Sequence, residues 1–327
     1  MFIINFVSEF LKLSVLIINL MKKELVTRIK QIIKEAQKAN HRRLFVIYGS
    51  KKAGLAARIV QLLGKNKKVL YASHSLEIEE DGVKNFKAFK KIVKKCDAII
   101  FPETEKVLGT TYDTCVIDLT HQLVPNDIGI LVEVVKGGGL VILLTPHFEE
   151  WGNIRTYFQE RLVSPPYTIN NVKPRFIQRF IKKLKEAKGI CIIDSDNEKM
   201  WYSKPKESKV KGVTLNLPTG TLFPLQVYKM CRTNEQIKVV KAFERFYEKR
   251  RGKDVVIVVA DRGRGKSAAL GIALAALCEK LGKVKKVKVF VTAPQFLNVK
   301  TLFDFLRLTF DKLKVKYKVL KYEDTIS

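Results

Sequence analysis

Residues 254–267 read DVVIVVADRGRGKS, an apolar, β-branched run that ends in a short basic turn containing two glycines. The sequence continues as AALGIALAALCEKLG (268–282), whose alanines and leucines favour a helix. Strand, glycine turn and helix in this order predict a phosphate-binding loop, in which backbone N–H groups and the helix N-terminus face phosphate oxygens. Lys266 is placed to reach the outer phosphates of ATP, and Ser267 is placed to hold its magnesium ion.

The fit to the pattern G-x-x-x-x-G-K-[ST] has one departure, because Ala260 stands at the first position. The alternative interpretation is an ordinary basic turn between a strand and a helix. That alternative leaves the GKS triplet and the alanine-rich helix unexplained.

A P-loop ATPase also needs particular segments before and after its phosphate loop. Upstream, TNEQ (233–236) begins a predicted helix with Thr233 as its N-cap, so Gln236 either reads an adenine edge or is simply exposed to solvent. Downstream, KVKVFVTAP (286–294) predicts a second strand, and a helix follows over 298–313. No apolar run ending in Asp comes after it, although such a strand holds magnesium and polarises water in these ATPases. We therefore expect the hydrolytic machinery to be incomplete in this chain.

The first half of the chain alternates short apolar runs with helical segments. Near-continuous Val, Ile and Leu predicts strands of a parallel sheet that is covered on both faces. The expected strands are LFVIY (44–48), VLYA (69–72), AIIF (98–101), CVIDL (115–119), LVILL (140–144) and GICIID (189–194). The expected helices are an amphipathic one over 22–38 and crossover helices over 52–63, 84–95 and 126–136, the last capped by the glycines at 137–139.

The predicted fold class is α/β, with a Rossmann-like doubly wound parallel sheet domain followed by a partial P-loop NTPase, helicase-like α/β domain. At 327 residues the chain can bury more than one core. We expect the first domain over 21–200, an irregular linker over 201–230 and a truncated second domain over 231–327. Residues 1–20 are apolar but are interrupted by Glu9 and Lys12, which leaves no run long enough to span a membrane. They are expected to be an N-terminal extension that is not native if translation starts at Met21.

Charge favours a polyanionic partner. The 61 Lys and Arg residues against 32 Asp and Glu give a formal charge of +29, which makes tRNA or another RNA the leading candidate. The predicted helix KPRFIQRFIKKLKEAK (173–188) could lie along an RNA backbone or be a solvated face. The same alternatives hold for 84–95. The candidate RNA-binding residues are Arg175, Arg179, Lys182 and Lys183.

Other chemistry-bearing residues show less pattern. The five cysteines form no CxxC pair and have no short spacing to histidine, so we expect neither zinc nor disulfides, and a reduced cytoplasmic protein with no membrane partner. The turn GSKKAG (49–54) repeats the glycine spacing of a phosphate loop with Leu55 at the lysine position, and an ordinary turn is the simpler interpretation. His121, Asp118 and Asp127 follow another predicted strand and receive no role.

Several segments together resemble one protein family. ADRGRGKSAALG (260–271), with alanine at the first loop position, resembles the signature of the tRNA(Met) cytidine acetyltransferases, the TmcA family, and of their eukaryotic relatives. LGTTYDTCVIDL (108–119) and VEVVKGGGLVILLTP (132–146) resemble that family's N-terminal domain. TNEQ and VTAPQFLNVKTLFDF (291–305) resemble the segments before and after its phosphate loop. The order is also the same, so the resemblance extends from Arg42 to the C-terminus.

The resemblance implies an enzyme that uses ATP and magnesium, and that transfers acetyl from acetyl-CoA to the exocyclic amine of a cytidine in RNA. The product is N4-acetylcytidine, typically at the wobble position of elongator methionine tRNA. Ser267 matches the family's magnesium position. The positions that match its ATP contacts are Gln236, Ala260, Asp261, Arg262, Gly263, Arg264, Gly265, Lys266, Ser267, Ala268 and Ala269.

The chain also departs from the family. The rest of the ATPase module, an acetyltransferase domain of the GNAT type and a C-terminal RNA-binding region are missing, as is the glycine-rich loop that holds acetyl-CoA. We therefore expect no catalytic acetyl-transfer residue here. The leading prediction is the N-terminal and ATP-binding portion of such an enzyme, with a separate chain carrying the rest. The alternatives are a stand-alone ATP-binding, RNA-binding module without acetyltransferase activity, and a gene remnant.

Overall fold

The computed structural model describes residues 23–64, 66–76, 80–206, 213–247, 254–261, 263–293, 296–320 and 325–326. The chain divides into two compact units, residues 1–210 and 211–327. The expected extension over 1–20 lies outside the described residues, as does Arg262. Among the helices that the structure describes, none combines the length and apolarity needed to cross a bilayer.

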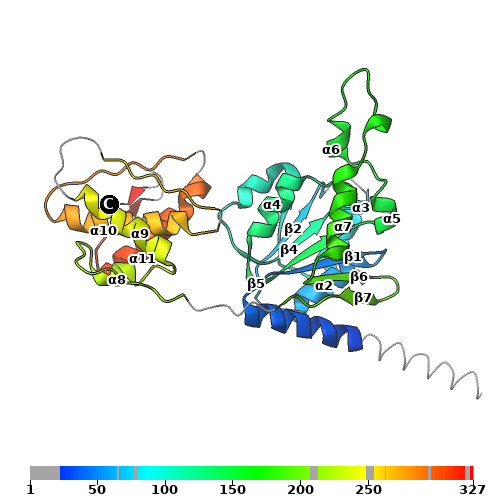
Figure 1. Cartoon of the computed structure of the whole chain (residues 1–327), viewed down its shortest axis with the longest axis horizontal. Coiled ribbons are helices and arrows are strands. Elements are labelled where there is room, and N and C mark those ends of the chain that lie inside the picture. The colour runs from blue at the N-terminus through cyan, green and yellow to red at the C-terminus, as the bar shows by residue number, and fades with distance from the viewer. Residues whose placement is uncertain are drawn as a thin grey trace, which may run out of the picture. The chain divides into compact units, whose positions relative to one another are not determined.

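The first unit contains a seven-stranded sheet in the order β3-β2-β4-β5-β1-β6-β7 (Figure 1). Every neighbouring pair is parallel except the β6–β7 hairpin. The strands are β1 (Arg43–Tyr48), β2 (Val69–Ser73), β3 (Asp97–Ile100), β4 (Tyr112–Asp118), β5 (Val135–Leu144), β6 (Ile190–Asp194) and β7 (Lys199–Tyr202). The mostly parallel sheet confirms the predicted fold class for this half of the chain.

Helices cover both faces of this sheet. One buried core joins the helix over 23–39, α2 (Lys52–Leu62) and α3 (Glu80–Ile92) to side chains such as Phe45 and Ile142. The other joins the sheet to η1 (Phe101–Val107), α4 (Pro125–Glu133), α5 (Phe148–Trp151) and α7 (Arg175–Glu186). Coverage on both sides explains why the strands are continuous apolar runs rather than alternating ones.

Two details of the sheet differ from the sequence prediction. Gly137, Gly138 and Gly139 do not cap a helix, because they lie inside β5. A Cβ at Gly139 would stand 2.4 Å from the carbonyl oxygen of Asp113, so the glycine allows β4 and β5 to approach where their register shifts. Strand β7 was not predicted. It straddles the expected boundary between the first domain (21–200) and the irregular linker (201–230), and its residues are half-buried or exposed.

The second unit consists mainly of helices. They are α8 (Leu225–Tyr228), α9 (Asn234–Ala242), η3 (Phe243–Phe246), α10 (Lys266–Gly282) and α11 (Phe296–Leu313), with a short antiparallel pair, β8 (Val319–Leu320) and β9 (Thr325–Ile326). Phe223, Val227 and Tyr228 are fully buried in its core. The segment expected as a linker over 201–230 therefore contributes to both units, through β7 and through this core.

The strands predicted from DVVIVV (254–259) and KVKVFVTAP (286–294) are wrong for this structure, which assigns no strand within 254–261 or 286–293. Side chains of the first segment alternate: Val256 packs on the helical core, whereas Val255, Ile257 and Val259 are 68%, 81% and 89% exposed. Phe290 in the second segment is 83% exposed. The apolar pattern suits a strand, but a strand needs a hydrogen-bonded neighbour, and neither segment has one among the described residues.

Candidate nucleotide-binding site

The glycine turn leads directly into α10, as the sequence predicts. Gly263 and Gly265 both have left-handed backbones, with φ of 73° and 79°, and Gly265 is the N-cap of the helix. Only glycine adopts this conformation without strain. Because the first N–H groups of a helix have no acceptor within it, the turn and the start of α10 present donors to one place. That arrangement suits phosphate oxygens.

Lys266 lies back across this loop. Its ammonium group donates hydrogen bonds to the carbonyl oxygens of Ala260 and Asp261, the second at 2.9 Å. The lysine is the first residue of α10 and is half-buried, as is Ser267. A phosphate group could take over these contacts, because it offers the ammonium a charged acceptor instead of two neutral carbonyls.

The other predicted ATP-contacting residues divide into two groups. Asp261, Gly263 and Arg264 are exposed on the loop, as is Ala260. Ala268 and Ala269 are buried and pack α10 into the unit, so only their backbone could reach a ligand.

Gln236 lies against the loop, although 28 residues separate it from Arg264. Its side-chain amide donates to the carbonyl oxygen of Arg264 at 3.4 Å and accepts from the N–H of Arg232 at 2.7 Å. The predicted cap also forms, since the Thr233 hydroxyl accepts from the N–H of Gln236 at 3.3 Å. Gln236 is half-buried, and its amide links α9 to the loop.

Magnesium would depend on few protein ligands at this site. Among the described residues, no group of three or more His, Cys, Asp or Glu side chains could hold a metal ion. Magnesium beside nucleotides commonly keeps waters and phosphate oxygens as ligands and takes only one or two from protein. The Ser267 hydroxyl suits that limited role.

We expect Gly265→Ala to disrupt this loop without unfolding the unit. An L-residue in the left-handed region costs on the order of 1–2 kcal/mol. The added Cβ would also stand 2.2 Å from the amide nitrogen of Gln236, which must move. Titration with ATP should show a loss of about tenfold or more. The control is Gly282→Ala at the other end of α10, where a Cβ meets nothing within 4 Å. Equal binding by the two variants would contradict a role for the loop conformation.

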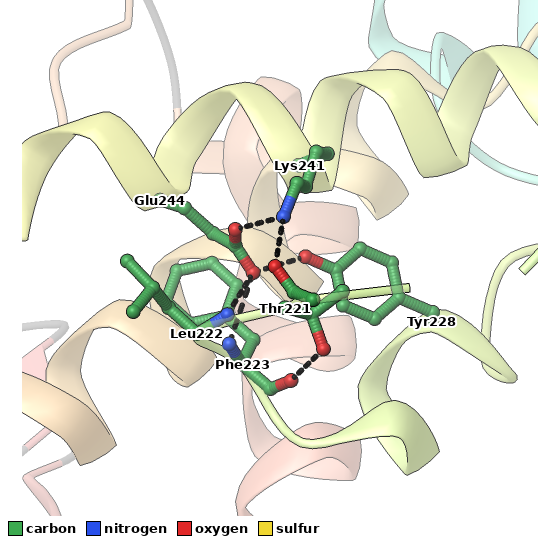
Figure 2. A network of polar contacts seen from close by, with 7 residues as sticks. Thr221, Leu222, Phe223, Tyr228, Lys241 and Glu244 are labelled. Atoms are coloured by element: carbon green, nitrogen blue, oxygen red, sulfur yellow. Dashed lines mark hydrogen bonds and ion pairs between the residues drawn. The ribbon is translucent and has the colours of Figure 1, made fainter. Parts of the chain in front are cut away.

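A buried carboxylate, Glu244, holds the segment that precedes α9. The sequence alone did not predict this contact. Glu244 is 4% exposed and accepts from the N–H groups of Leu222 and Phe223 at 2.8 and 3.0 Å. It also accepts from the Tyr228 hydroxyl at 2.5 Å and the Lys241 ammonium at 2.6 Å. Figure 2 shows the carboxylate directed into these donors. Burial alone would raise the Glu244 pKa, but the hydrogen bonds hold that pKa below its usual value.

The turn over 49–54 in the first unit is not a second phosphate loop. Gly49 has a φ of 101°, but a carboxylate of the protein already occupies the turn just before α2. Asp196 accepts from the N–H of Ser50 at 2.9 Å and from its hydroxyl at 2.6 Å, and these bonds lower the Asp196 pKa. The ordinary turn is therefore the correct interpretation.

Two of the three residues left without a role, Asp118 and Asp127, have separate partners. Asp118 accepts from the Tyr71 hydroxyl at 3.1 Å and from the Asn85 amide at 2.9 Å, at the end of β4. Asp127 instead accepts from Thr104 at 2.6 Å. Asp118 and Asp127 are close in the sequence, but their partners Asn85 and Thr104 belong to helices on opposite faces of the sheet.

The candidate RNA-binding residues lie on the exposed side of α7 in the first unit. Lys182 and Lys183 pair with Glu186, at 3.8 and 3.0 Å. Arg175 and Arg179 are exposed and have no ion pair among the described residues. The buried residues of α7 are Ile177, Ile181 and Leu184, on the side away from these cations.

Comparison with known proteins gives the family. Residues 21–195 match the family described as tRNA(Met) cytidine acetyltransferase TmcA, N-terminal, and residues 257–327 match RNA cytidine acetyltransferase NAT10/TcmA, helicase domain. The second match includes the glycine loop and α10.

Proteins named tRNA(Met) cytidine acetyltransferase TmcA are similar along most of the chain. The protein of Thermococcus kodakarensis is 37% identical over 88% of this chain and 39% of its own length. Those of Methanopyrus kandleri and Pyrococcus abyssi are 36% and 34% identical over 89% and 92% of this chain, and over 36% and 40% of their own lengths. The chain thus spans about two fifths of the curated relatives it matches, and it belongs to the tRNA(Met) cytidine acetyltransferase TmcA family.

Proposed function

We propose that this chain is the N-terminal and ATP-binding portion of an ATP-dependent RNA cytidine acetyltransferase, whose full-length form makes N4-acetylcytidine from acetyl-CoA. The single observation that carries the proposal is the loop from Gly263 to Ser267, with two left-handed glycines at the start of α10 and with Gln236 against it. Methionine tRNA is the proposed RNA, because that is what the relatives are named for.

Each residue of the loop has a proposed task. The N–H groups that follow Gly263 and Gly265 bind phosphate oxygens, and Lys266 leaves the carbonyls of the loop to neutralise the outer phosphates. Ser267 holds magnesium. Bound ATP supplies the free energy to position RNA, and we assign no acetyl-transfer residue to this chain.

The bare apolar side of 255–259 supports a further part of the proposal. Three β-branched side chains are more than two-thirds exposed there, in a segment whose other side packs on helices. P-loop sheets are covered on both faces. We therefore propose that additional polypeptide, from a longer form or from a separate chain, covers this side and completes the ATPase.

The proposed setting is the cytoplasm, where the substrate RNA occurs. All five cysteines are free thiols. This is the state expected in a reducing compartment.

The test is ATP binding by the purified chain with magnesium, measured by calorimetry. Lys266→Ala removes the phosphate-binding cation and should weaken ATP binding by about tenfold or more, as expected for losing a charge-assisted bond. The matched control is Lys283→Ala, which follows the end of α10 and pairs with Glu279, and it should bind within about twofold of wild type. No binding by folded wild type, or equal loss in both variants, would contradict the proposal. Repeating the titration with methionine tRNA tests whether the two ligands are coupled.

A further inference from the structure

The exposed apolar side chains of the first unit are concentrated in one short segment. The described residues of that unit include seven large apolar side chains that are exposed, and five of them lie between residues 157 and 176. Four of the five are aromatic. The five are Tyr157, Phe158, Leu162, Tyr167 and Phe176. Figure 1 shows this green segment projecting beyond the sheet before the chain returns along α7. We call residues 156–174 the arm.

The arm has a defined backbone rather than an irregular one. At its start, the Thr156 hydroxyl accepts from the N–H of Gln159, and the Gln159 side chain accepts from the N–H of Thr156 at 3.0 Å. Near its end, the Asn171 side chain accepts from the N–H of Thr168 at 2.8 Å. These reciprocal caps fix the short helices α6 (Tyr157–Glu160) and η2 (Ile169–Asn171).

The base of the arm is anchored to the carboxyl end of the parallel sheet. The buried Gln122, which follows β4, accepts from the N–H of Phe158 at 3.1 Å. The ring of Tyr157 stacks on that of His74, which follows β2, with centroids 4.9 Å apart and planes 23° apart. Strands β2 and β4 are neighbours whose chains continue to opposite faces of the sheet. Ligands of open α/β sheets bind beside such switch points.

The charge around these rings is strongly positive. Residues 155–185 contain eight Lys or Arg and one acidic residue, Glu160. Arg161, Arg175 and Arg179 have no ion pair among the described residues. Phe176 stacks on Phe180 with centroids 6.0 Å apart, so the rings continue from the arm onto α7. Cations beside exposed rings are the chemistry that recognises single-stranded nucleic acid, because bases stack on rings and phosphates pair with arginine.

We propose that the arm and the adjoining start of α7 bind a single-stranded stretch of RNA, with Tyr167 as a stacking platform and with Arg175 and Arg179 on phosphates. This rests on the proposed function for the choice of RNA. It adds an RNA-binding site in the first unit. Single-stranded RNA is the expected ligand, because the bases of duplex RNA are stacked on one another and have no free face for Tyr167.

The experiment measures binding of the full chain to a fluorescent single-stranded RNA and to a duplex of the same sequence. Tyr167 is 67% exposed, so its replacement should not disturb a core. Tyr167→Ala and Tyr167→Leu should each weaken single-strand binding by about tenfold, whereas Tyr167→Phe keeps the ring and should bind like wild type. Duplex binding should change little. The control is Trp201→Ala, which removes a ring that is 50% exposed on β7 of the same unit.

Arginine variants test the other half of the site. Arg175→Gln and Arg179→Gln should weaken binding to both RNAs and should each reduce the salt dependence by about one phosphate contact. Single-strand binding by Tyr167→Leu that matches wild type would overturn the proposal in favour of apolar docking by a protein. A loss in Trp201→Ala equal to that in Tyr167→Ala would also overturn it. ATP titration of the same variants separates this proposal from the proposed function. If the variants bind both ATP and RNA like wild type, the RNA site on the arm is overturned and the proposed ATP-binding function is not.

Discussion

Replacing Glu244 with alanine is expected to destabilise the second unit by about 3 kcal/mol or more. The side chain is the acceptor for two backbone N–H groups and for the fully buried hydroxyl of Tyr228 (Figure 2). Each buried donor left without an acceptor costs about 1–3 kcal/mol. Lys241 would in addition lose its carboxylate partner. The loss should exceed that of any exposed charge in α9 or η3.

Two spectroscopic signals can assign that loss to one unit. Both tryptophans, Trp151 and Trp201, belong to the first unit, so their fluorescence follows its unfolding. Circular dichroism at 222 nm follows the helices of both units. Glu244→Ala should shift to lower denaturant only the part of the dichroism transition that has no counterpart in fluorescence, because that part reports unfolding of the second unit. Glu235→Ala, at an exposed position of α9, is the control and should change stability by less than about 1 kcal/mol. A shifted tryptophan transition in Glu244→Ala would contradict this assignment.

The Glu244 carboxylate should also make the second unit sensitive to acid. Its pKa in the folded unit is below the ordinary value of 4.5, so the unfolded chain binds the proton more readily. The stabilisation is therefore complete above the ordinary pKa and is lost as the pH falls through the folded-state pKa. Urea unfolding of wild type and Glu244→Gln at pH 7 and below pH 4 should show the difference between them shrink in acid. A difference that is constant or that grows in acid would contradict the lowered pKa.

Local patterns were enough to predict most of the first unit. β1, β2 and β6 coincide with apolar runs, because a strand buried on both faces needs a continuous series of apolar side chains. β7 escaped prediction because it is a short edge strand, paired with β6 alone, whose residues alternate between exposed and half-buried. The glycines in β5 were misassigned because a close approach of two backbones and a helix cap require the same residue type.

Contacts between distant residues could not be predicted in the same way. Asp196 accepts a hydrogen bond from Ser50, 146 residues away in the sequence, and Glu244 accepts one from Leu222, 22 residues away. No fixed spacing marks either pair. Gln236 was a candidate only because of its place before the loop, and its contact with Arg264 depends on how α9 and α10 share a core. The apolar run over 254–259 shows the opposite case. Its pattern suits a strand, but pattern alone does not supply the neighbouring strand that a sheet requires.

Gly271→Ala is expected to separate α10 from α11 and to weaken the support of the glycine loop. A Cβ at Gly271 would stand 2.3 Å from the carbonyl oxygen of Leu302 and 3.1 Å from the N–H nitrogen of Leu306. Both are backbone atoms of α11, so they cannot turn aside as a side chain could. Alanine favours a helix over glycine by about 1 kcal/mol, but overpacking against backbone costs about 1–3 kcal/mol. Because the clash is with backbone atoms, we expect the cost to exceed the gain and the net loss to reach about 2 kcal/mol.

The matched control for Gly271→Ala is again Gly282→Ala, in the same helix but with open space around the new methyl group. It should stabilise the unit by a few tenths of a kcal/mol, so the two variants should move the dichroism transition in opposite directions. α10 carries Lys266 and Ser267 at its first turn, and α11 packs along it beside Ala275 and Leu306. Displacing α11 should therefore weaken ATP binding as well as stability, whereas stabilisation by Gly271→Ala would contradict the close approach of the two helices.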